Sequence, residues 1–122
     1  MKVAVIDDSV MIQSILKEQI ENNIPGAEVE TFWGLGYISP EDYDVLIVDN
    51  AGIGDENYKN GVEFLCDYAS VSHAPQLIIH YTGLCDRSDQ ERLDACYGVN
   101  IVDKGNGCNQ VLDLIREWAE MK

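Results

Sequence analysis

Three carboxylates follow short apolar runs near the start and the middle of this sequence. Asp7 and Asp8 come directly after the run Val3 to Ile6, and Asp49 comes directly after the run Val45 to Val48. Each run has the length of a buried β-strand, so the carboxylates are expected at strand ends. Carboxylates held close together repel one another, and a cation bound among them removes that penalty. Mg²⁺, which binds a few carboxylates and keeps several waters, suits these three side chains.

Two further polar side chains complete a set suited to phosphoryl transfer. Thr82 follows the stretch Gln76 to Tyr81, and Lys104 lies just beyond the run Val99 to Val102. A carboxylate can attack phosphorus and form an aspartyl phosphate when cationic groups neutralise the phosphoryl oxygens. Asp49 is the expected nucleophile, the lysine ammonium would pair with one phosphoryl oxygen, and the threonine hydroxyl would donate a hydrogen bond to another. Each residue alone has an ordinary structural explanation, and their joint placement is what favours a site.

The order of the apolar segments predicts the elements that would bring these side chains together. Five apolar runs alternate with amphipathic segments, which is typical of a parallel sheet covered by helices on both faces. In such a flavodoxin-like, doubly wound α/β fold, the functional site lies beyond the carboxyl ends of the strands. Four runs are continuously apolar and predict strands buried on both faces, whereas the second run alternates and predicts an edge strand. The predicted strands are Lys2 to Ile6, Ala27 to Trp33, Asp44 to Val48, Gln76 to Tyr81 and Val99 to Val102.

Helical periodicity is clear in four of the intervening segments and weak in one. Apolar residues recur at helical spacing from Ile12 to Ile20 and from Val111 to Ala119. The segments Asn60 to Ala69 and Asp86 to Tyr97 predict two more helices. The stretch Gly34 to Tyr43 contains two glycines and a proline, so the second helix of the series is expected to be short or missing.

Together these positions resemble the receiver domain of bacterial response regulators over the full chain. The matching features are the acidic pair Asp7 and Asp8, then Asp49, Thr82 and Lys104, each near the end of its strand. The resemblance implies a chain that takes a phosphoryl group onto Asp49 from a sensor histidine kinase or a histidine phosphotransfer protein. It also implies that the phosphorylated chain signals through contacts with another protein.

The resemblance further implies a set of metal ligands and a class of protein. By this resemblance, Asp8 and Asp49 contact Mg²⁺ directly, Asp7 acts partly through water, and the backbone carbonyl of Ala51 completes the site. A receiver is a signalling domain rather than an enzyme, because its chemistry is limited to its own phosphorylation and dephosphorylation. Residues 1–122 are expected to form one such domain, with no output domain.

Departures from the family pattern leave an alternative open. Gly105 follows Lys104 where the family usually has proline, and Asn106 comes next. The segment Asn50 to Lys59 lacks the family's common Met-Pro pair and is longer than usual. A chain in which these changes prevented phosphorylation would be a pseudo-receiver, a docking or dimerisation module that works independently of phosphorylation.

Composition limits the classes of partner. The 122 residues include 22 acidic and 8 basic side chains, and the formal net charge of −14 repels nucleic-acid backbones and anionic lipid headgroups. Direct binding to nucleic acid or membrane is therefore not expected. The four cysteines, Cys66, Cys85, Cys96 and Cys108, are widely spaced and are expected to be free thiols. The chain shows neither a signal peptide nor an apolar stretch of membrane-spanning length, so a cytoplasmic location is expected.

Overall fold

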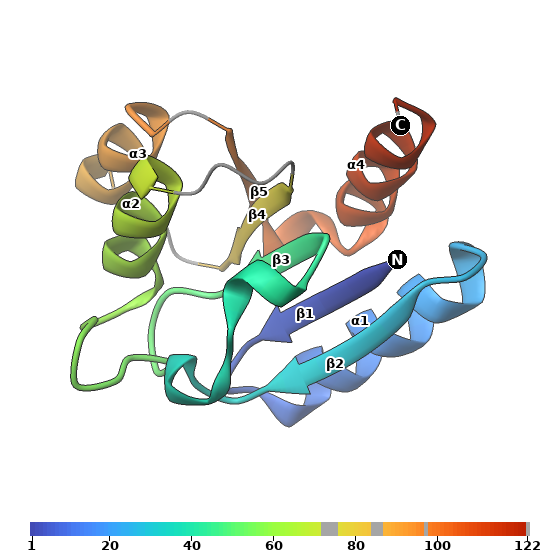
Figure 1. Ribbon diagram of the computed structural model, residues 1–122, viewed down its shortest axis with the longest axis horizontal. Coiled ribbons are helices and arrows are strands. Elements are labelled where there is room, and N and C mark those ends of the chain that lie inside the picture. Colours follow the sequence, from blue (N-terminus) through green and yellow to red (C-terminus); the bar gives the residue numbers. More distant parts are fainter. Residues whose placement is uncertain (72–75, 84–86, 97, 122) are drawn as a thin grey trace.

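A parallel five-stranded sheet lies between two layers of helices in the computed structural model, which describes residues 1–71, 76–83, 87–96 and 98–121 (Figure 1). The strands lie in the order β2-β1-β3-β4-β5. Their bounds are β1 Lys2–Ile6, β2 Glu28–Phe32, β3 Val45–Val48, β4 Leu77–Thr82 and β5 Val99–Asp103. Because the chain leaves β1 for one neighbour and returns to the other, the direction of winding changes between β1 and β3. The predicted doubly wound α/β architecture is confirmed.

The helices divide evenly between the two faces of the sheet (Figure 1). The α-helices of the described residues are α1 Val10–Asn23, α2 Gly61–Val71, α3 Arg87–Asp94 and α4 Asn109–Glu120. Single 3-10 turns are η1 Leu35–Tyr37, η2 Pro40–Asp42 and η3 Lys104–Asn106. Helices α1 and α4 share one apolar cluster with the sheet, and α2 and α3 share the other.

The two apolar clusters follow from the alternation of side chains along each strand. In β1, Val5 belongs to the cluster that contains Leu16 of α1 and Ile115 of α4. The next residue, Ile6, belongs to the cluster that contains Leu65 of α2. Successive side chains of a strand point to opposite faces, so a strand covered on both sides must be apolar at every position. This explains the continuous apolar runs of the sequence.

The segment between β2 and β3 holds no α-helix, as its glycines and proline predict. Its place is taken by η1 and by η2, where Pro40 occupies the first turn. Leu35 in η1 is buried, and its amide donates a 2.8 Å hydrogen bond to the carbonyl of Ile53. The short segment thus closes its side of the sheet with turns and also anchors the loop that follows β3.

Some predicted element boundaries and the predicted burial of the fifth strand were wrong. Thr82 is the last residue of β4 rather than the residue after it, and α3 ends at Asp94. The predicted ends of that helix, Asp86 and Tyr97, lie outside the described residues. Strand β5 was expected to be buried on both faces, but it is the second edge of the sheet, so most of its side chains are only half-buried.

Two expectations from composition can be compared with the structure. Within the described part of the chain, no helix combines the length and the apolar character that crossing a bilayer requires. Cys66, Cys96 and Cys108 are free thiols, as expected, and Cys85 lies outside the described residues.

Candidate functional site

The three carboxylates singled out from the sequence meet at the carboxyl ends of two neighbouring strands. Asp7 follows β1 and Asp49 follows β3, and the amide of Asp49 donates a 2.9 Å hydrogen bond to the carbonyl of Ile6. One carboxylate oxygen from each of Asp7, Asp8 and Asp49 lies within 4.8 Å of the others. Asp7 and Asp49 are buried, whereas Asp8 is exposed. The strand register therefore produces the cluster that the sequence predicted.

Lys104 reaches into this cluster from the turn after β5. Its ammonium lies 2.7 Å from a carboxylate oxygen of Asp7 and 3.2 Å from one of Asp49. The lysine side chain is only 20% exposed, so both ion pairs are shielded from water on most sides. Lys104 thus holds the two buried carboxylates together and supplies positive charge where a phosphoryl group on Asp49 would lie.

Burial and mutual proximity shift the pKa values of Asp49 and Lys104. Burial raises the pKa of Asp49 above its ordinary value, and Asp7 adds to the rise, although the Asn50 amide and Lys104 oppose it. Burial alone would lower the pKa of Lys104, but its contacts with Asp7 and Asp49 raise it overall. The lysine is therefore cationic at neutral pH. Asp49 carries a desolvation penalty that a further cation would relieve.

Thr82 lies at the same edge of the sheet as the acidic cluster. It ends β4, the strand that pairs with β3, and it is 4% exposed. A cavity of about 400 Å³ opens beside it, lined in part by Gln90, Asn106 and Gln110. The five predicted site residues thus come from the ends of β1, β3, β4 and β5, which are consecutive neighbours in the sheet.

Gly105, which departs from the family pattern, has a local role. Its amide donates a 2.7 Å hydrogen bond to the Asp103 carboxylate, and this bond begins the η3 turn that carries Lys104. Proline has no amide hydrogen and could not make the bond. All peptide bonds of the described residues are trans. The turn that presents Lys104 is therefore closed by a side-chain cap.

Residues that the sequence analysis did not single out fix the orientation of Asp7. The amide of Ser9 donates a 2.9 Å hydrogen bond to one carboxylate oxygen of Asp7, leaving the other oxygen to Lys104. The Ser9 hydroxyl accepts a bond from Ile12 and caps α1. Gln13 of α1 donates a 2.6 Å bond to the carbonyl of Asp7. A serine directly before a helical apolar pattern is the sequence signal that identifies such a cap.

Two glycines permit the close packing of the loop that follows Asp49. Gly61 begins α2 against the backbone carbonyl of Asp49, which a Cβ atom at position 61 would overlap. Gly52 has a φ of +82° and lies against the carboxylate of Asp8, which a side chain at position 52 would displace. This contact could not be predicted, because nothing in the sequence shows that Asp8 is the neighbour of Gly52.

Replacing Gly52 with alanine is expected to weaken divalent cation binding about tenfold or more, because the new methyl group must push Asp8 out of the cluster. Gly26→Ala is the matched control, since Gly26 has a φ of +81° and open space around it. Both variants should lose about 1 kcal/mol of unfolding free energy from backbone strain. Isothermal titration with Mg²⁺ compares them, and equal affinities in the two variants would contradict a role for Asp8 in cation binding.

Asn50 links the site to both helices of the adjacent layer. Its side-chain oxygen accepts a 3.2 Å hydrogen bond from the amide of Val62 in α2, and its side-chain nitrogen donates a 3.2 Å bond to Asp89 in α3. Neither contact is apparent from the sequence, in which Asn50 is only the residue after Asp49. The residue next to Asp49 therefore connects the carboxylate cluster to the N-terminal parts of α2 and α3.

Solved structures of receiver domains share this architecture over nearly their whole length. The signal receiver domain of a DNA-binding response regulator (merR) from Colwellia psychrerythraea 34H superposes with a TM-score of 0.80 at 18% identity, covering 98% of each chain. This chain has the receiver-domain fold. A LuxR-family DNA-binding response regulator from Staphylococcus aureus gives a TM-score of 0.77 at 15% identity, covering 96% of this chain and 97% of that one.

A third receiver structure was determined with a phosphate mimic. The isolated receiver domain of RcsB from Salmonella enterica serovar Typhimurium, in the presence of phosphomimetic BeF₃⁻, gives a TM-score of 0.76 at 22% identity, covering 98% of this chain and 86% of that one. No protein-family model matches the sequence, and no curated protein matches it. The likeness to receivers is therefore one of fold at low sequence identity.

The carboxylates at the carboxyl ends of the strands fit a small divalent cation. Asp7, Asp8 and Asp49 offer hard oxygen donors within reach of one ion, and Gly52 leaves room for Asp8 beside them. Ala51, the fourth ligand implied by the family resemblance, lies in the turn directly after Asn50. Within the described part of the chain, these carboxylates form the one cluster of three potential metal-binding side chains.

Proposed function

We propose that this receiver-fold chain accepts a phosphoryl group on Asp49 in a Mg²⁺-dependent reaction and signals through contacts with other proteins. The observation that carries the proposal is the contact of one lysine, Lys104, with both buried carboxylates of a three-carboxylate cluster. One ammonium balances the charge of only one of the three carboxylates when all are ionised. Three carboxylates at one strand edge instead suit a site that binds a cation and an incoming phosphoryl group.

The chain's own residues support each requirement of the transfer. A carboxylate oxygen of Asp49 attacks phosphorus as the bond from phosphorus to the donor breaks, so the phosphoryl group passes from the donor to Asp49. Lys104 then pairs with a phosphoryl oxygen, and the hydroxyl of Thr82 donates a hydrogen bond to another. Mg²⁺, held by Asp7, Asp8, Asp49 and the Ala51 carbonyl, supplies positive charge for the phosphoryl oxygens when bound.

The partners proposed are proteins. A phosphohistidine of a sensor histidine kinase or a histidine phosphotransfer protein is the donor, and a further protein recognises the phosphorylated chain. The net charge of −14 opposes direct binding to nucleic acid or anionic membranes. On this proposal the chain is a cytoplasmic signalling domain, residues 1–122 form one receiver unit, and its own phosphorylation and dephosphorylation are the only phosphoryl-transfer reactions that it carries out.

Incubation with acetyl phosphate and Mg²⁺ tests the phosphoryl transfer. The expected result is one covalent adduct of about 80 Da, labile to base and to hydroxylamine as an acyl phosphate is, and absent when EDTA removes the cation. Trapping with hydroxylamine and peptide mapping should locate it on Asp49. An unmodified chain, alongside a receiver of known activity that becomes labelled, would contradict the proposal.

The alternative is a pseudo-receiver that docks or dimerises without phosphorylation. It predicts no adduct under these conditions and unchanged partner binding when Asp49 is replaced by alanine or asparagine. The departures at Gly105, at Asn106 and in the loop after Asp49 motivate it. The capped turn around Gly105 still delivers Lys104 to the carboxylates, and this favours the phosphoryl acceptor.

A further inference from the structure

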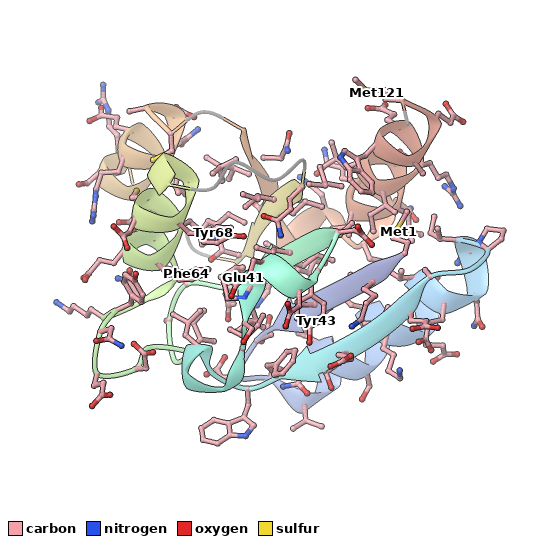
Figure 2. All side chains as sticks on the ribbon, viewed as in Figure 1. Met1, Glu41, Tyr43, Phe64, Tyr68 and Met121 are labelled. Carbon is pink, nitrogen blue, oxygen red and sulfur yellow. The ribbon has the colours of Figure 1, made fainter. Side chains whose placement is uncertain are left out.

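Two cysteines from separate segments come together beside α2 and α3, the helices that cover one face of the sheet (Figure 1). Figure 2 labels Phe64 and Tyr68 of α2. Cys66 lies in α2, and Cys96 lies two residues after the end of α3. Both thiols point to one backbone carbonyl, that of Arg92, with sulfur to oxygen distances of 3.9 Å for Cys66 and 3.3 Å for Cys96. Thirty positions apart in the sequence, they are neighbours only in the fold.

We propose that Cys66 and Cys96 are a reversible dithiol site, which a peroxide converts to a disulfide that joins α2 to the end of α3. The Cys96 thiolate attacks one peroxide oxygen, and the oxygen–oxygen bond breaks. The other oxygen takes up a proton and departs as water, and Cys96 becomes a sulfenic acid. The Cys66 thiolate then attacks that sulfur, expelling the sulfenic oxygen as a second water. Two sulfurs lose two electrons to one peroxide, and reduction by an external thiol restores both cysteines.

Among the described cysteines, the fold places Cys66 and Cys96, and not Cys108, where they can form a disulfide with each other. Both thiols are half-buried, so small oxidants can reach them while larger reagents meet them slowly. Cys108 packs against the opposite apolar cluster, with α1 and α4, and the sheet separates it from Cys66 and Cys96. A disulfide requires two Cβ atoms about 4 Å apart. Two sulfurs at 3.9 and 3.3 Å from one oxygen lie no more than about 7 Å from each other, so a small shift of α2 or of the segment after α3 would bring them together.

The order of the two steps follows from the surroundings of Cys66. Burial, and then the neighbouring Cys96 thiol, raise the pKa of the Cys66 thiol to about 11, with Arg92 opposing the rise and Asp89 adding to it. A thiol of such high pKa reacts slowly with peroxide at neutral pH, because the thiolate is the nucleophile. Cys66 is therefore the thiol that closes the disulfide. The closing rate should increase as pH rises from 7 to 9.

A Cys66–Cys96 bond would join the two helices beside the candidate site. Asn50, next to Asp49, already contacts Val62 of α2 and Asp89 of α3. The disulfide would restrain the same two helices at a second point and would shorten the open chain of the unfolded state. Oxidation is therefore expected to raise the midpoint of thermal unfolding by several degrees, whether or not Asp49 is ever phosphorylated.

Peroxide treatment of the whole chain tests the site. Low millimolar hydrogen peroxide should remove two titratable thiols, lower the mass by about 2 Da, and yield one cross-linked peptide pair containing Cys66 and Cys96. Dithiothreitol should reverse all three changes. Peptide mapping of the unmutated protein also distinguishes a bond to Cys85, which the described residues do not include. A cross-link to any other cysteine, or oxidation to sulfinic acid with no cross-link, would overturn the proposal.

Serine variants supply the matched comparison. Cys66→Ser and Cys96→Ser should each abolish the cross-link and the rise in thermal midpoint, whereas Cys108→Ser should retain both. Far-ultraviolet circular dichroism of each reduced variant shows whether the fold is kept. Retention of the same cross-linked species in Cys66→Ser would reject the assignment independently of the mapping.

Discussion

Replacement of Asp49 with asparagine is expected to abolish the acyl phosphate adduct while leaving the fold intact. Asparagine keeps the size and shape of the side chain but lacks the nucleophilic carboxylate oxygen, so no aspartyl phosphate can form at this position. Intact-mass analysis after incubation with acetyl phosphate and Mg²⁺ measures the loss. The same substitution should weaken Mg²⁺ binding, because one of three clustered carboxylates is removed.

The stability of Asp49→Asn distinguishes an inactive chain from a misfolded one. The pKa of Asp49 is raised in the folded chain, chiefly by burial, so the ionised side chain lowers stability at neutral pH without cation. This penalty disappears as pH falls through the raised pKa to below the unfolded value of about 3.9. Urea unfolding in EDTA should therefore show the variant at least as stable as the parent chain at pH 7. The advantage should shrink toward pH 4.

Asp113→Asn provides the control for charge alone. Asp113 is an exposed carboxylate of α4 that pairs with Arg116, away from the cluster. This variant should form the adduct at the parental rate and bind Mg²⁺ with parental affinity. An adduct on Asp49→Asn equal to that of the parent chain would show that the acceptor is a different residue.

Replacement of Lys104 with methionine is expected to lower stability, raise Mg²⁺ affinity and slow adduct formation, because one ammonium group affects all three. The ammonium contacts Asp7 at 2.7 Å and Asp49 at 3.2 Å, and its removal leaves two buried carboxylates facing each other. Unfolding free energy at pH 7 in EDTA should fall by about 1 to 3 kcal/mol, and the deficit should shrink as pH falls and the carboxylates protonate. Denaturant titrations at several pH values measure this.

Loss of the Lys104 ammonium should also raise the affinity for Mg²⁺ and lower the rate of adduct formation. Mg²⁺ affinity should increase about tenfold, because the cation no longer competes with the ammonium for the same carboxylates. The rate of adduct formation should nevertheless fall by about 10²-fold, because one partner of the phosphoryl oxygens is missing. Isothermal titration and time-resolved mass analysis measure the two quantities.

The matched control for Lys104→Met is Arg87→Met. Arg87 forms an exposed ion pair with Glu91, with side chains 94% and 69% exposed, so its loss should change stability by less than about 0.5 kcal/mol. It should leave Mg²⁺ binding and adduct formation unchanged. Weaker Mg²⁺ binding in Lys104→Met than in the parent chain would contradict the competition between the lysine and the cation.

The apolar pattern was sufficient to predict the sheet, because a parallel strand covered on both faces must be apolar at consecutive positions. It predicted β1, β3 and β4 to within a residue or two and the edge position of β2. It failed to predict the environment of β5, since an apolar run has the same appearance in a central strand and in an edge strand. Only the strand order shows that β5 has a neighbour on one side.

The positions of the site residues were predictable for a similar reason. Parallel strands place their carboxyl ends at one edge, so any polar residue after a strand end is brought to that edge. Asp7, Asp8, Asp49 and Thr82 gather there for this reason, and Lys104 reaches them from the turn after β5.

Contacts between segments distant in sequence could not be predicted. Gly52 lies against Asp8, Asn50 joins α2 to α3, and the thiols of Cys66 and Cys96 share the Arg92 carbonyl. No periodicity or spacing in the sequence relates these partners. Each depends on the packing of loops and helices once the sheet has formed.

Local sequence pattern was enough to specify the doubly wound sheet and the edge at which its carboxylates meet, because strand periodicity and strand-end chemistry are local properties of the chain. The tertiary structure alone decided which groups touch across that edge. It joined one Lys104 ammonium to both Asp7 and Asp49, and it raised the pKa of Asp49 by burying it among them. Distances and desolvation arise only when separate segments pack together, so no reading of neighbouring residues could provide them.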